Sequence, residues 1–481
     1  MSVSFADFEA HFNAGRTQLV WRWMSADLET PVSAYLKLCG GRSNAILLES
    51  IEGGEKLGRY SIIGFDPDLI WKDSHHSDPL ASLKQTIADC KIDIVPDDLP
   101  PMAASGLFGY LGYDMVRLVE DIPNANPDDL GIPRSIMMRP QSLVIFDNVK
   151  NILCAVTPVY EHSSADAKTV FDRAQARLDA IAVALEQPID PALTKAKTAL
   201  TTPLDVRSNT TRAEYHAMVE KAVEYIHQGE IFQVVPGQRF EVDFDLSSFD
   251  LYRSLRKLNP SPFMVHLKLD DFALVASSPE ILVRVREGTV TIRPIAGTRK
   301  RGKTPEEDQA LAAELLADPK ERAEHLMLLD LGRNDVGRVS EYGSVKVTEE
   351  FVIEYYSHVM HIVSNVEGKL RADLDIVDAH FAGFPAGTVS GAPKVRAMEI
   401  IDELEKSRRS YYGGSIGYFS GHGEMDSCIA LRTALVKDGK VYVQAGGGVV
   451  ADSDPDFEYQ ETVNKSKAII TAAEQAIEAA Q

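Results

Sequence analysis

The spacing of apolar side chains divides the chain into a strand-rich region, a helix, a polar linker and a second strand-rich region. Between Ala165 and Leu185, apolar residues recur mostly at intervals of three and four, which predicts an amphipathic helix. The next segment is rich in Pro, Thr and Lys and poor in large apolar residues, so it predicts a domain boundary at about residues 187–208. Before this helix, short apolar runs predict strands at residues 45–50, 60–64, 106–112 and 142–147.

The region after the linker combines many strand-like runs with fewer helices. Thr210 or Thr211 can cap a helix over residues 211–228, because Glu214 lies in its first turn and Gly229 follows its end. Further helices are expected at residues 305–317, 320–331, 392–407 and 457–480. The apolar runs between them are joined mainly by short turns. This pattern predicts an α+β fold of largely antiparallel sheets wrapped by helices, and not a doubly wound sheet.

Composition then narrows the class of protein. A chain of 481 residues exceeds one typical hydrophobic core, which indicates two or three domains or one large interlocked core. The formal net charge of −21 argues against binding to nucleic acid or to an anionic membrane surface. Four scattered cysteines, an N-terminus without a signal-peptide pattern and no long apolar run together predict a cytoplasmic protein.

Two pairs of glutamates are candidates for a metal site. Glu321 and Glu324 lie three residues apart at one predicted helix start, and Glu458 and Glu461 do so at another. Residues three apart share a helix face, and oxygen ligands from two such helices would suit Mg²⁺. Glutamates in a first turn also complement the helix dipole, and spacing alone favours this ordinary role.

Glycine-rich segments and isolated polar residues form a second group of candidates. The segments AGFPAGTVSGAPK and QAGGGVV can bring backbone N–H groups to an anion, although tight turns are their commoner use. Arg432, in the apolar strand CIALRTALV, needs either a carboxylate ligand or an internal salt bridge. His361 on a strand and Glu280 at a strand entrance have ordinary structural roles as alternatives. The residues alone indicate an enzyme for a small anionic substrate, with Mg²⁺ as a candidate cofactor.

Several segments, in their order and spacing, resemble the chorismate-utilising enzymes. They are PIAGTRKRG, ERAEHLMLLDLGRNDVGRV, HVMHIVSNVEG, FPAGTVSGAPK, YYGGSIGYFS, LRTALV, QAGGGVV and ETVNK. This family includes anthranilate synthase component I, aminodeoxychorismate synthase component I, isochorismate synthase and salicylate synthase. The resemblance covers nearly the whole chain and implies the family's α+β fold. It implies an N-terminal region at 1–190 that carries part of a tryptophan regulatory site, and a chorismate-binding catalytic region at 208–481.

The resemblance also implies a role for each matching residue. The implied Mg²⁺ ligands are Glu324 and Glu461, with Glu321 and Glu458 nearby or bound through water. The implied substrate contacts are Gly297, Thr298, Thr388, Tyr412, Arg432, Lys465, Gly446, Gly447 and Gly448. Glu280 would be the general acid for the departing 4-hydroxyl group, which requires a raised pKa, and His361 would assist the loss of pyruvate.

Two positions discriminate between members of the family. Enzymes that add water place a lysine base where this chain has Gln233, and a glutamine cannot deprotonate water, so ammonia is the favoured nucleophile. Aminodeoxychorismate synthases typically carry a nucleophilic lysine in PIKGT, where this chain has Ala296. Attack of ammonia at C2 is therefore favoured, giving 2-amino-4-deoxyisochorismate and then anthranilate and pyruvate. The aminodeoxychorismate reaction of the folate pathway is the alternative.

Two further motifs, LLES and NPSPFM, resemble a tryptophan feedback site. The implied inhibitor contacts are Glu49, Ser50, Pro262, Phe263 and Met264. No amidotransferase domain, with a cysteine nucleophile and a distant histidine, is visible in the sequence. The resemblance therefore predicts a hetero-oligomer in which a separate glutamine amidotransferase subunit, component II, supplies ammonia. This activity would be the first committed step of tryptophan biosynthesis.

Overall fold

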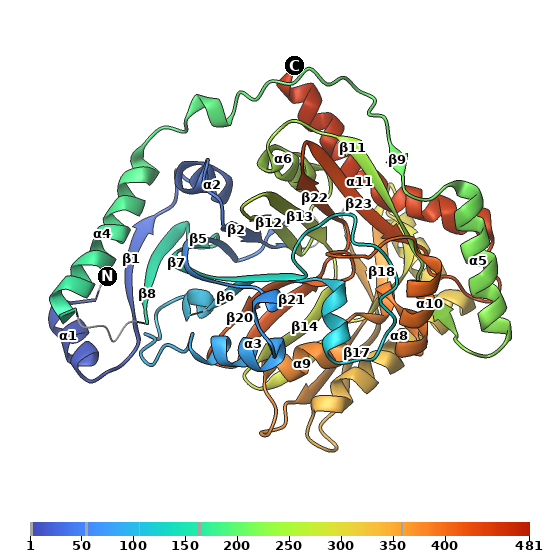
Figure 1. Ribbon diagram of the computed structural model, residues 1–481, viewed down its shortest axis with the longest axis horizontal. Helices are drawn as coiled ribbons and strands as arrows, with labels where there is room; N and C mark the ends of the chain where they lie inside the picture. The colour runs from blue at the N-terminus through green and yellow to red at the C-terminus, as the bar shows by residue number, and fades with distance from the viewer. Residues whose placement is uncertain (1–2, 53–55, 105, 161–164, 357–358) are drawn as a thin grey trace.

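The computed structural model describes residues 3–52, 56–104, 106–160, 165–356 and 359–481. Most strands join in one large sheet, whose strand pairs are antiparallel. The sheet forms two layers that meet at the long strand β7 (Ser135–Asp147), because β7 pairs with strands of both (Figure 1). The predicted α+β class with largely antiparallel sheets is confirmed.

The first layer contains strands from both ends of the chain. Its order is β9 (Arg207–Ser208), β11 (Gly237–Asp243), β23 (Lys440–Gly446), β22 (Thr433–Lys437), β13 (Phe272–Ser278), β12 (Phe263–Lys268), β2 (Ala45–Glu49), β5 (Tyr60–Trp71), β7, β8 (Ile152–Val159) and β1 (Gln18–Ser25). The two halves of the chain join where β2 pairs with β12, and Glu49 lies opposite Met264 there.

The second layer continues from the other end of β7. Its strands are β6 (Leu107–Leu111), β20 (Ser415–Phe419), β21 (Met425–Ile429), β14 (Ile281–Arg286), β15 (Thr289–Ile292) and β18 (Val359–Lys369), which pairs with β16 (Ile295–Lys300) and β17 (Lys346–Tyr355). Two short pairs lie apart, β10 (Gln233–Val234) with β19 (Gly391–Ala392) and β3 (Ile51–Glu52) with β4 (Lys56–Leu57).

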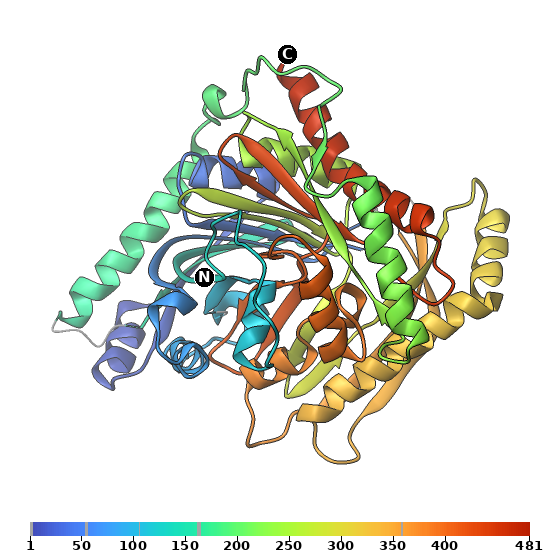
Figure 2. The ribbon, with the colours of Figure 1, turned by 45° about the vertical axis from the view of Figure 1, so that its right-hand side comes forward.

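Helices cover the outer faces of both layers (Figures 1 and 2). The first layer packs against α1 (Phe5–Asn13), α2 (Pro31–Cys39), α4 (Ala167–Glu186), α6 (Ser248–Leu258) and α11 (Pro455–Ala480). The second packs against α3 (Pro79–Ala88), α7 (Pro305–Ala317), α8 (Pro319–Val339) and α9 (Ile376–Gly383). A smaller core holds α5 (Arg212–His227) and α10 (Lys394–Leu404) together beside β10.

The polar segment expected near residues 187–208 is an extended connection. Between α4 and β9, residues 187–206 are all described, and their one regular turn is the 3₁₀ turn Pro191–Leu193. In Figure 1 this segment arches over the top of the molecule and passes near the C-terminus. Strands from both sides of the connection pair within the same sheet. The division into regions 1–190 and 208–481 therefore stays a proposal about how the chain is organised.

Predicted helix starts agree with the structure better than predicted ends. Thr211 caps α5 and forms a capping box with Glu214, as the sequence predicts. The expected helix at 320–331 is α8, which continues to Val339 because its later turns are buried and Asp335 pairs with Lys394. The helix expected at 392–407 is shorter at both ends and forms α10. Five further α-helices among the described residues were not predicted, and each has only 8 to 11 residues. They are α1, α2, α3, α6 and α9.

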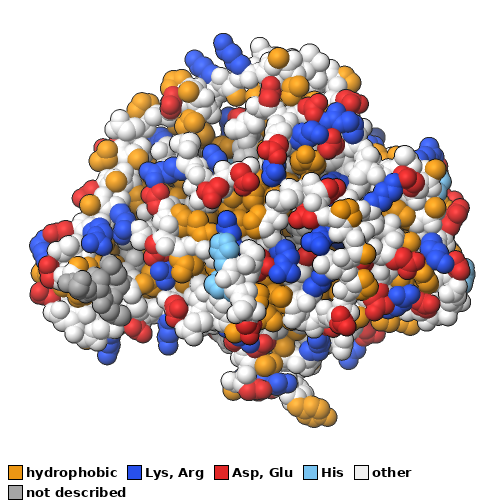
Figure 3. Space-filling view, viewed as in Figure 1, with side chains coloured by type: hydrophobic (Ala, Val, Ile, Leu, Met, Phe, Trp, Pro, Cys, Tyr) orange, Lys and Arg blue, Asp and Glu red, His pale blue; other side chains and the backbone are white. Residues whose placement is uncertain are grey.

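The visible surface carries charges of both signs. Figure 3 shows acidic and basic side chains interspersed over one face, without a continuous basic area. Of the helices in the described ranges, none combines the length and the hydropathy that crossing a membrane would require.

Apolar side chains from both layers pack against each other in one buried core, which stabilises the sheet. Leu274 on β13 lies between Leu267 on β12 and Leu435 on β22, and all three side chains are fully buried in it. We expect Leu274→Ala to lower the free energy of unfolding by about 2–5 kcal/mol, because it removes buried methyl groups and leaves a cavity. Urea denaturation followed by circular dichroism measures the change.

The matched control is Leu28→Ala, because Leu28 is 91% exposed. That substitution should change the free energy of unfolding by less than about 0.5 kcal/mol. Equal effects of the two substitutions would show that the layer contact does not carry the stability assigned to it.

Candidate active site

One cavity of about 560 Å³ collects the residues expected to bind metal and substrate. Its wall is built from α8, α11, β10, β16, β18, the segment before β14, the turn before β20, the β21–β22 connection and the end of β23. The expected residues in the wall are Gln233, Glu280, Gly297, Thr298, Glu321, Glu324, His361, Thr388, Tyr412, Arg432, Gly446, Gly448, Glu458, Glu461 and Lys465. Segments far apart in sequence therefore share one site.

Four carboxylates enter this cavity from the first two turns of two helices. Asp318 caps α8 and Asp454 caps α11, so the start of each helix is fixed close to the glutamates that follow. Each glutamate has a polar partner outside this group of four. The pairs are Arg299 Nη1 with Glu321 at 2.9 Å, Gln233 Nε2 with Glu324 at 3.0 Å, Ser453 Oγ with Glu458 at 2.7 Å, and Lys465 Nζ with Glu461 at 3.0 Å. These hydrogen bonds and ion pairs offset part of the repulsion among the four carboxylates in one cavity.

The carboxylates remain under electrostatic strain in spite of their partners. Burial raises the pKa of Glu324, and the charges of Glu321 and Glu461 raise it further. Burial and the neighbouring Glu461 also raise the pKa of Glu458, whose buried Oε2 has no hydrogen-bond partner among the described residues. Burial acts in the same direction on Glu461, but Lys465 outweighs it and lowers that pKa. A cation placed among these oxygens would relieve the strain.

The carboxylates do not form a complete metal-binding group by themselves. Within the described ranges, no three His, Cys, Asp or Glu side chains converge closely enough to hold a metal ion. A divalent cation here would take its remaining ligands from water or from a bound anion, which is the usual arrangement for Mg²⁺.

The charges that line the cavity are balanced. Arg299, Lys320, Arg432 and Lys465 face the four glutamates, and the fifth glutamate in the wall, Glu280, has a raised pKa. A dianion alone would therefore leave an excess of two negative charges in a partly buried space. A dianion that enters with a divalent cation preserves the balance, so the site suits that pair of ligands.

Glu280 has the environment that a proton donor needs. It lies just before β14, and Thr388 Oγ1 donates to both carboxylate oxygens at 3.2 Å. Burial raises the pKa of Glu280 to about 8, although the hydrogen bonds from Thr388 and from the Ile295 backbone act against this change. At neutral pH the carboxyl group is therefore largely protonated, as the sequence predicts for a general acid.

His361 on β18 is held in one tautomer. Its Nδ1 lies 2.9 Å from the carbonyl oxygen of Gly297, which can only accept, so Nδ1 carries the proton and Nε2 is the acceptor. Burial, followed by the charge of Arg432, lowers the pKa of His361 to about 4. The ring is therefore neutral at neutral pH and can take up a proton at Nε2.

Arg432 differs from its expected position within a strand. The apolar run CIALRTALV forms β21 and β22, and Arg432 lies in the connection between them with a φ of +48°. Its guanidinium has no hydrogen bond or ion pair within 4 Å to any residue of the described ranges. Of the two alternatives left open by the sequence, an internal salt bridge is wrong. The geometry favours a ligand that carries a carboxylate.

The three glycines after β23 have different environments. Gly446 and Gly448 line the cavity, whereas Gly447 lies behind them and donates its N–H to the carbonyl oxygen of Pro236. A Cβ atom at Gly447 would lie 2.9 Å from Glu458 Oε2, and one at Gly448 would lie 2.7 Å from Gln233 Nε2. Glycine is needed here because α11 and β10 approach the backbone so closely.

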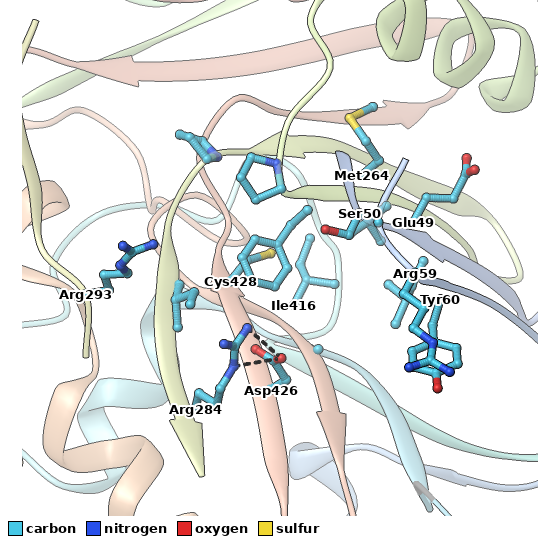
Figure 4. A pocket seen from close by; sticks show the side chains of 18 of the residues that line it. Glu49, Ser50, Arg59, Tyr60, Met264, Arg284, Arg293, Ile416, Asp426 and Cys428 are labelled. Carbon is cyan, nitrogen blue, oxygen red and sulfur yellow. Dashed lines mark hydrogen bonds and ion pairs between the residues drawn. The ribbon is translucent and has the colours of Figure 1, made fainter. Parts of the chain in front are cut away.

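A second cavity, of about 780 Å³, is lined by all five residues of the expected feedback site. They are Glu49, Ser50, Pro262, Phe263 and Met264 (Figure 4). Ser50 points its hydroxyl toward the other lining side chains, whereas the Glu49 carboxylate points away from them (Figure 4). Arg256 binds that carboxylate at 2.8 and 3.0 Å, and Tyr252 donates to it as well. A ligand would therefore meet the backbone of Glu49 and not its charge.

Two aspects of the site have no counterpart in the sequence analysis. Arg299 lies in the quoted motif PIAGTRKRG, but only the structure shows that it binds Glu321 and Asp318. Arg299 lies two residues after Gly297 in the sequence, and this proximity to an expected substrate contact could have indicated that Arg299 belongs to the site. Pro279 and Ile295 line both cavities, so the two expected sites share a wall.

Comparison with known proteins identifies the family of the chain. Residues 43–471 match the family described as chorismate binding enzyme. The chain is 53% identical to anthranilate synthase component 1 of Cereibacter sphaeroides over 98% of each chain, and 48% identical to that of Pseudomonas putida over 93% of each. The crystal structure of anthranilate synthase component I from Streptococcus pneumoniae aligns with a TM-score of 0.77 and 37% identity, covering 93% of this chain and 99% of that one. The isochorismate synthase MenF of Escherichia coli shares the fold, with a TM-score of 0.72 at 18% identity over 98% of each chain.

The environment of Glu280 gives a prediction about stability and pH. Because the native state holds a proton that the unfolded state loses above its ordinary pKa, Glu280 lowers the stability of the fold as the pH rises from about 4.5 to 8. The glutamine in Glu280→Gln does not ionise, so its contribution to stability does not change with pH in this range. We expect the stability of this variant relative to wild type to increase between pH 5 and pH 8 by on the order of a few kcal/mol.

Urea denaturation at pH 5, 6.5 and 8 measures this difference. Glu306→Gln is the control, because Glu306 is exposed on α7 and its difference from wild type should stay constant with pH. A constant difference for Glu280→Gln as well would mean that the carboxyl group is already ionised in the native state.

Proposed function

Because the chain belongs to the chorismate binding enzyme family, we propose that it converts chorismate and ammonia to anthranilate and pyruvate. The relatives that match nearly its whole length are named anthranilate synthase component 1. The observation that carries the proposal is that Arg432, which has no ion-pair partner among the described residues, lines the same cavity as four carboxylates. Gln233 and Ala296 in the same wall add to it, because they exclude the lysine-dependent reactions of other members.

Magnesium is part of this proposal. Glu324 and Glu461 would be its principal ligands, with Glu321 and Glu458 nearby or bound through water. The unpartnered Oε2 of Glu458, the raised pKa values and the charge balance of the cavity all support a divalent cation. When bound, Mg²⁺ would hold the ring carboxylate of chorismate and withdraw electron density from it.

The other side of the cavity would bind the enolpyruvyl carboxylate. Arg432 supplies the opposite charge, and Tyr412 Oη and the backbone at Gly446 lie beside each other in the same wall. Lys465 Nζ is held 2.8 Å from the carbonyl oxygen of Gly446, so its charge also lies close to this end of the site. These contacts would fix the ring with its C4 hydroxyl group toward Glu280.

The first chemical step is the replacement of the 4-hydroxyl group by an amine at C2. Ammonia forms a bond with C2, the two conjugated ring double bonds shift, and the C4–O bond breaks as Glu280 gives its proton to the departing oxygen, which leaves as water. The new ammonium group at C2 then loses one proton to solvent, and Glu280 takes up one proton from solvent. Thr388 keeps the carboxyl group of Glu280 in place for this transfer. Gln233 cannot act as a base, and unprotonated ammonia does not need one.

The second step is the loss of pyruvate. The hydrogen at C2 leaves as a proton, the C3–O bond breaks, and the ring becomes aromatic as the enol of pyruvate departs. Nε2 of neutral His361 is the acceptor available for that proton, because Nδ1 is already bonded to Gly297. Departure of the enol then completes the formation of anthranilate.

The ammonia is proposed to come from a second subunit. The names of the relatives, component 1, imply a partner component. We assign to this partner the glutamine amidotransferase activity of component II, so that the two chains act as a cytoplasmic hetero-oligomer. The reaction would then be the first committed step of tryptophan biosynthesis.

The larger cavity is proposed to bind L-tryptophan as a feedback inhibitor. Its apolar wall, which includes Pro262, Phe263 and Met264, suits an indole ring. Pro279 and Ile295 belong to both cavities and are neighbours in sequence of Glu280 and Ala296. A ligand in the larger cavity would therefore touch residues that determine the shape of the substrate site.

The proposed activity can be tested with the purified chain alone. Chorismate, Mg²⁺ and an ammonium salt at high pH should yield blue-fluorescent anthranilate and pyruvate. We expect Glu324→Gln to lower this activity by at least about 100-fold, because a carboxylate near the metal and the ring carboxylate is lost. Glu306→Gln, on the surface of α7, is the matched control and should retain wild-type activity.

Calorimetric titration with Mg²⁺ gives a second measurement, in which Glu324→Gln should bind the ion more weakly than the control. Accumulation of a 4-amino isomer in place of anthranilate would identify the aminodeoxychorismate reaction instead. Full activity of Glu324→Gln would contradict the metal assignment.

The feedback site can be tested by filling its cavity. Ser50→Phe places a ring where the hydroxyl group now points, so the tryptophan concentration for half-inhibition should rise by at least about 10-fold, with little loss of activity. Ser77→Phe, at an exposed position outside the cavity, is the control and should leave inhibition unchanged. Unchanged inhibition of Ser50→Phe would place the regulatory site elsewhere.

A further inference from the structure

A buried ion pair lies beneath the substrate cavity. Arg409 Nη2 and Glu405 Oε1 are 2.6 Å apart, and the two side chains are 1% and 3% exposed. Neither residue lines the cavity, and no step of the proposed reaction uses either of them. A charged pair without solvent costs free energy that well-packed apolar side chains would not cost. Stability alone is therefore a poor reason for its position.

Arg409 bonds two segments that carry residues of the site. Nη1 donates to the carbonyl oxygen of Val389, the residue after Thr388. Nη2 donates to the carbonyl oxygen of Val235, two residues after Gln233. One planar guanidinium thus fixes the backbone next to Thr388, which bonds Glu280, and near Gln233, which bonds Glu324.

The same guanidinium lies over the ring of Tyr412. The distance from the guanidinium carbon to the ring centroid is 5.4 Å, which is within the range of a cation–π contact. Tyr412 is the residue whose hydroxyl group lies beside Gly446 in the cavity wall. Arg409 therefore also restrains a residue that is proposed to bind the substrate carboxylate.

Glu405 extends the contacts to the end of β23. Its Oε1 accepts the N–H of Gly237 at 2.7 Å, and its Oε2 accepts from Gln444 Nε2 at 3.2 Å. Gln444 precedes Gly446 by two residues on β23, and Gly237 follows the proline that accepts the N–H of Gly447. The carboxylate therefore links the start of β11 to the end of β23, which leads into the glycine segment.

We propose that Arg409 and Glu405 are positioning residues that hold four separate parts of the substrate site in register. These parts carry Gln233, Thr388, Tyr412 and Gly446. The pair acts through its bonds to the neighbouring backbone and to the Tyr412 ring, and it does not touch the substrate. The identity of that substrate rests on the proposed function.

The test separates the stability of the fold from the geometry of the site. Arg409→Met leaves Glu405 as an uncompensated buried charge, so its Tm should fall well below that of wild type. The double variant Arg409→Met/Glu405→Gln removes both charges and keeps a similar volume, so its Tm should return most of the way. Its kcat/KM for chorismate should nevertheless stay about 100-fold below wild type, because the site residues are no longer held in place.

A second readout is direct binding of chorismate. Without ammonia the proposed reaction does not proceed, so isothermal titration calorimetry with chorismate and Mg²⁺ reports binding alone. We expect the double variant to bind chorismate at least about 10-fold more weakly than wild type, in line with misplaced carboxylate contacts. This measurement also applies if the wild-type chain binds chorismate but forms no anthranilate, in which case only the proposed function fails.

The control is a partly buried ion pair whose residues do not line the cavity. Lys37 on α2 pairs with Glu29, and their side chains are 11% and 16% exposed. Lys37→Met/Glu29→Gln should leave kcat/KM within about 2-fold of wild type, whatever its effect on Tm. A similar loss of activity in this control would mean that removing any buried pair harms the enzyme.

Recovery of both Tm and kcat/KM in the double variant would overturn the proposal, because the pair would then serve the fold alone. If the double variant does not fold, Arg409→Lys replaces it. A lysine keeps the charge next to Glu405, but its single amine cannot reproduce the planar fork that bonds both carbonyl groups. A folded Arg409→Lys variant with wild-type kcat/KM would also overturn the proposal.

Discussion

The site depends on holding four like charges in one partly buried space. Glu321 and Glu324 come from α8, and Glu458 and Glu461 come from α11. Burial and the neighbouring carboxylates raise the pKa values of Glu324 and Glu458. Such an arrangement persists only if each carboxylate has a partner and if both helix starts are fixed. The caps Asp318 and Asp454 fix the helices, and two cations and two neutral donors hold the carboxylates.

The antiparallel architecture explains how these distant segments meet. The two sheet layers share β7, and their outer faces carry α8 and α11, which begin at the cavity (Figures 1 and 2). Where strands end near the site, the backbone adopts conformations that a regular ladder would not allow. Arg432 has a positive φ between two strands, and Gly448 follows β23 where a Cβ atom would collide with Gln233. The sheet therefore supplies rigid edges, and its irregular ends supply the contacts with ligand.

The sequence predicts which residues line the site better than it predicts their geometry. The α+β class, the cap at Thr211, the helix starts of α7 and α11 and most residues of the cavity wall follow from local patterns and from the family resemblance. The length of α8 does not, because its last turns depend on the contact of Asp335 with Lys394. Local patterns also miss the turn at Arg432 and the orientation of Glu49, since both are decided by residues distant in sequence. That the residues of the site lie in one cavity is decided by the tertiary structure and not by any local pattern.

The wall between the two cavities suggests how regulation and catalysis share one structural element. Ile281 faces the larger cavity, whereas Glu280 faces the smaller one, so adjacent residues before and on β14 belong to different sites. Ile295 lines both cavities, and its backbone forms a hydrogen bond with the Glu280 carboxyl group. A bound inhibitor that displaced this segment would change both the position of the acid and the burial that raises its pKa. Under the proposed regulation, a small movement of the wall is therefore enough to affect proton transfer, because that step needs Glu280 both protonated and within reach of the departing oxygen.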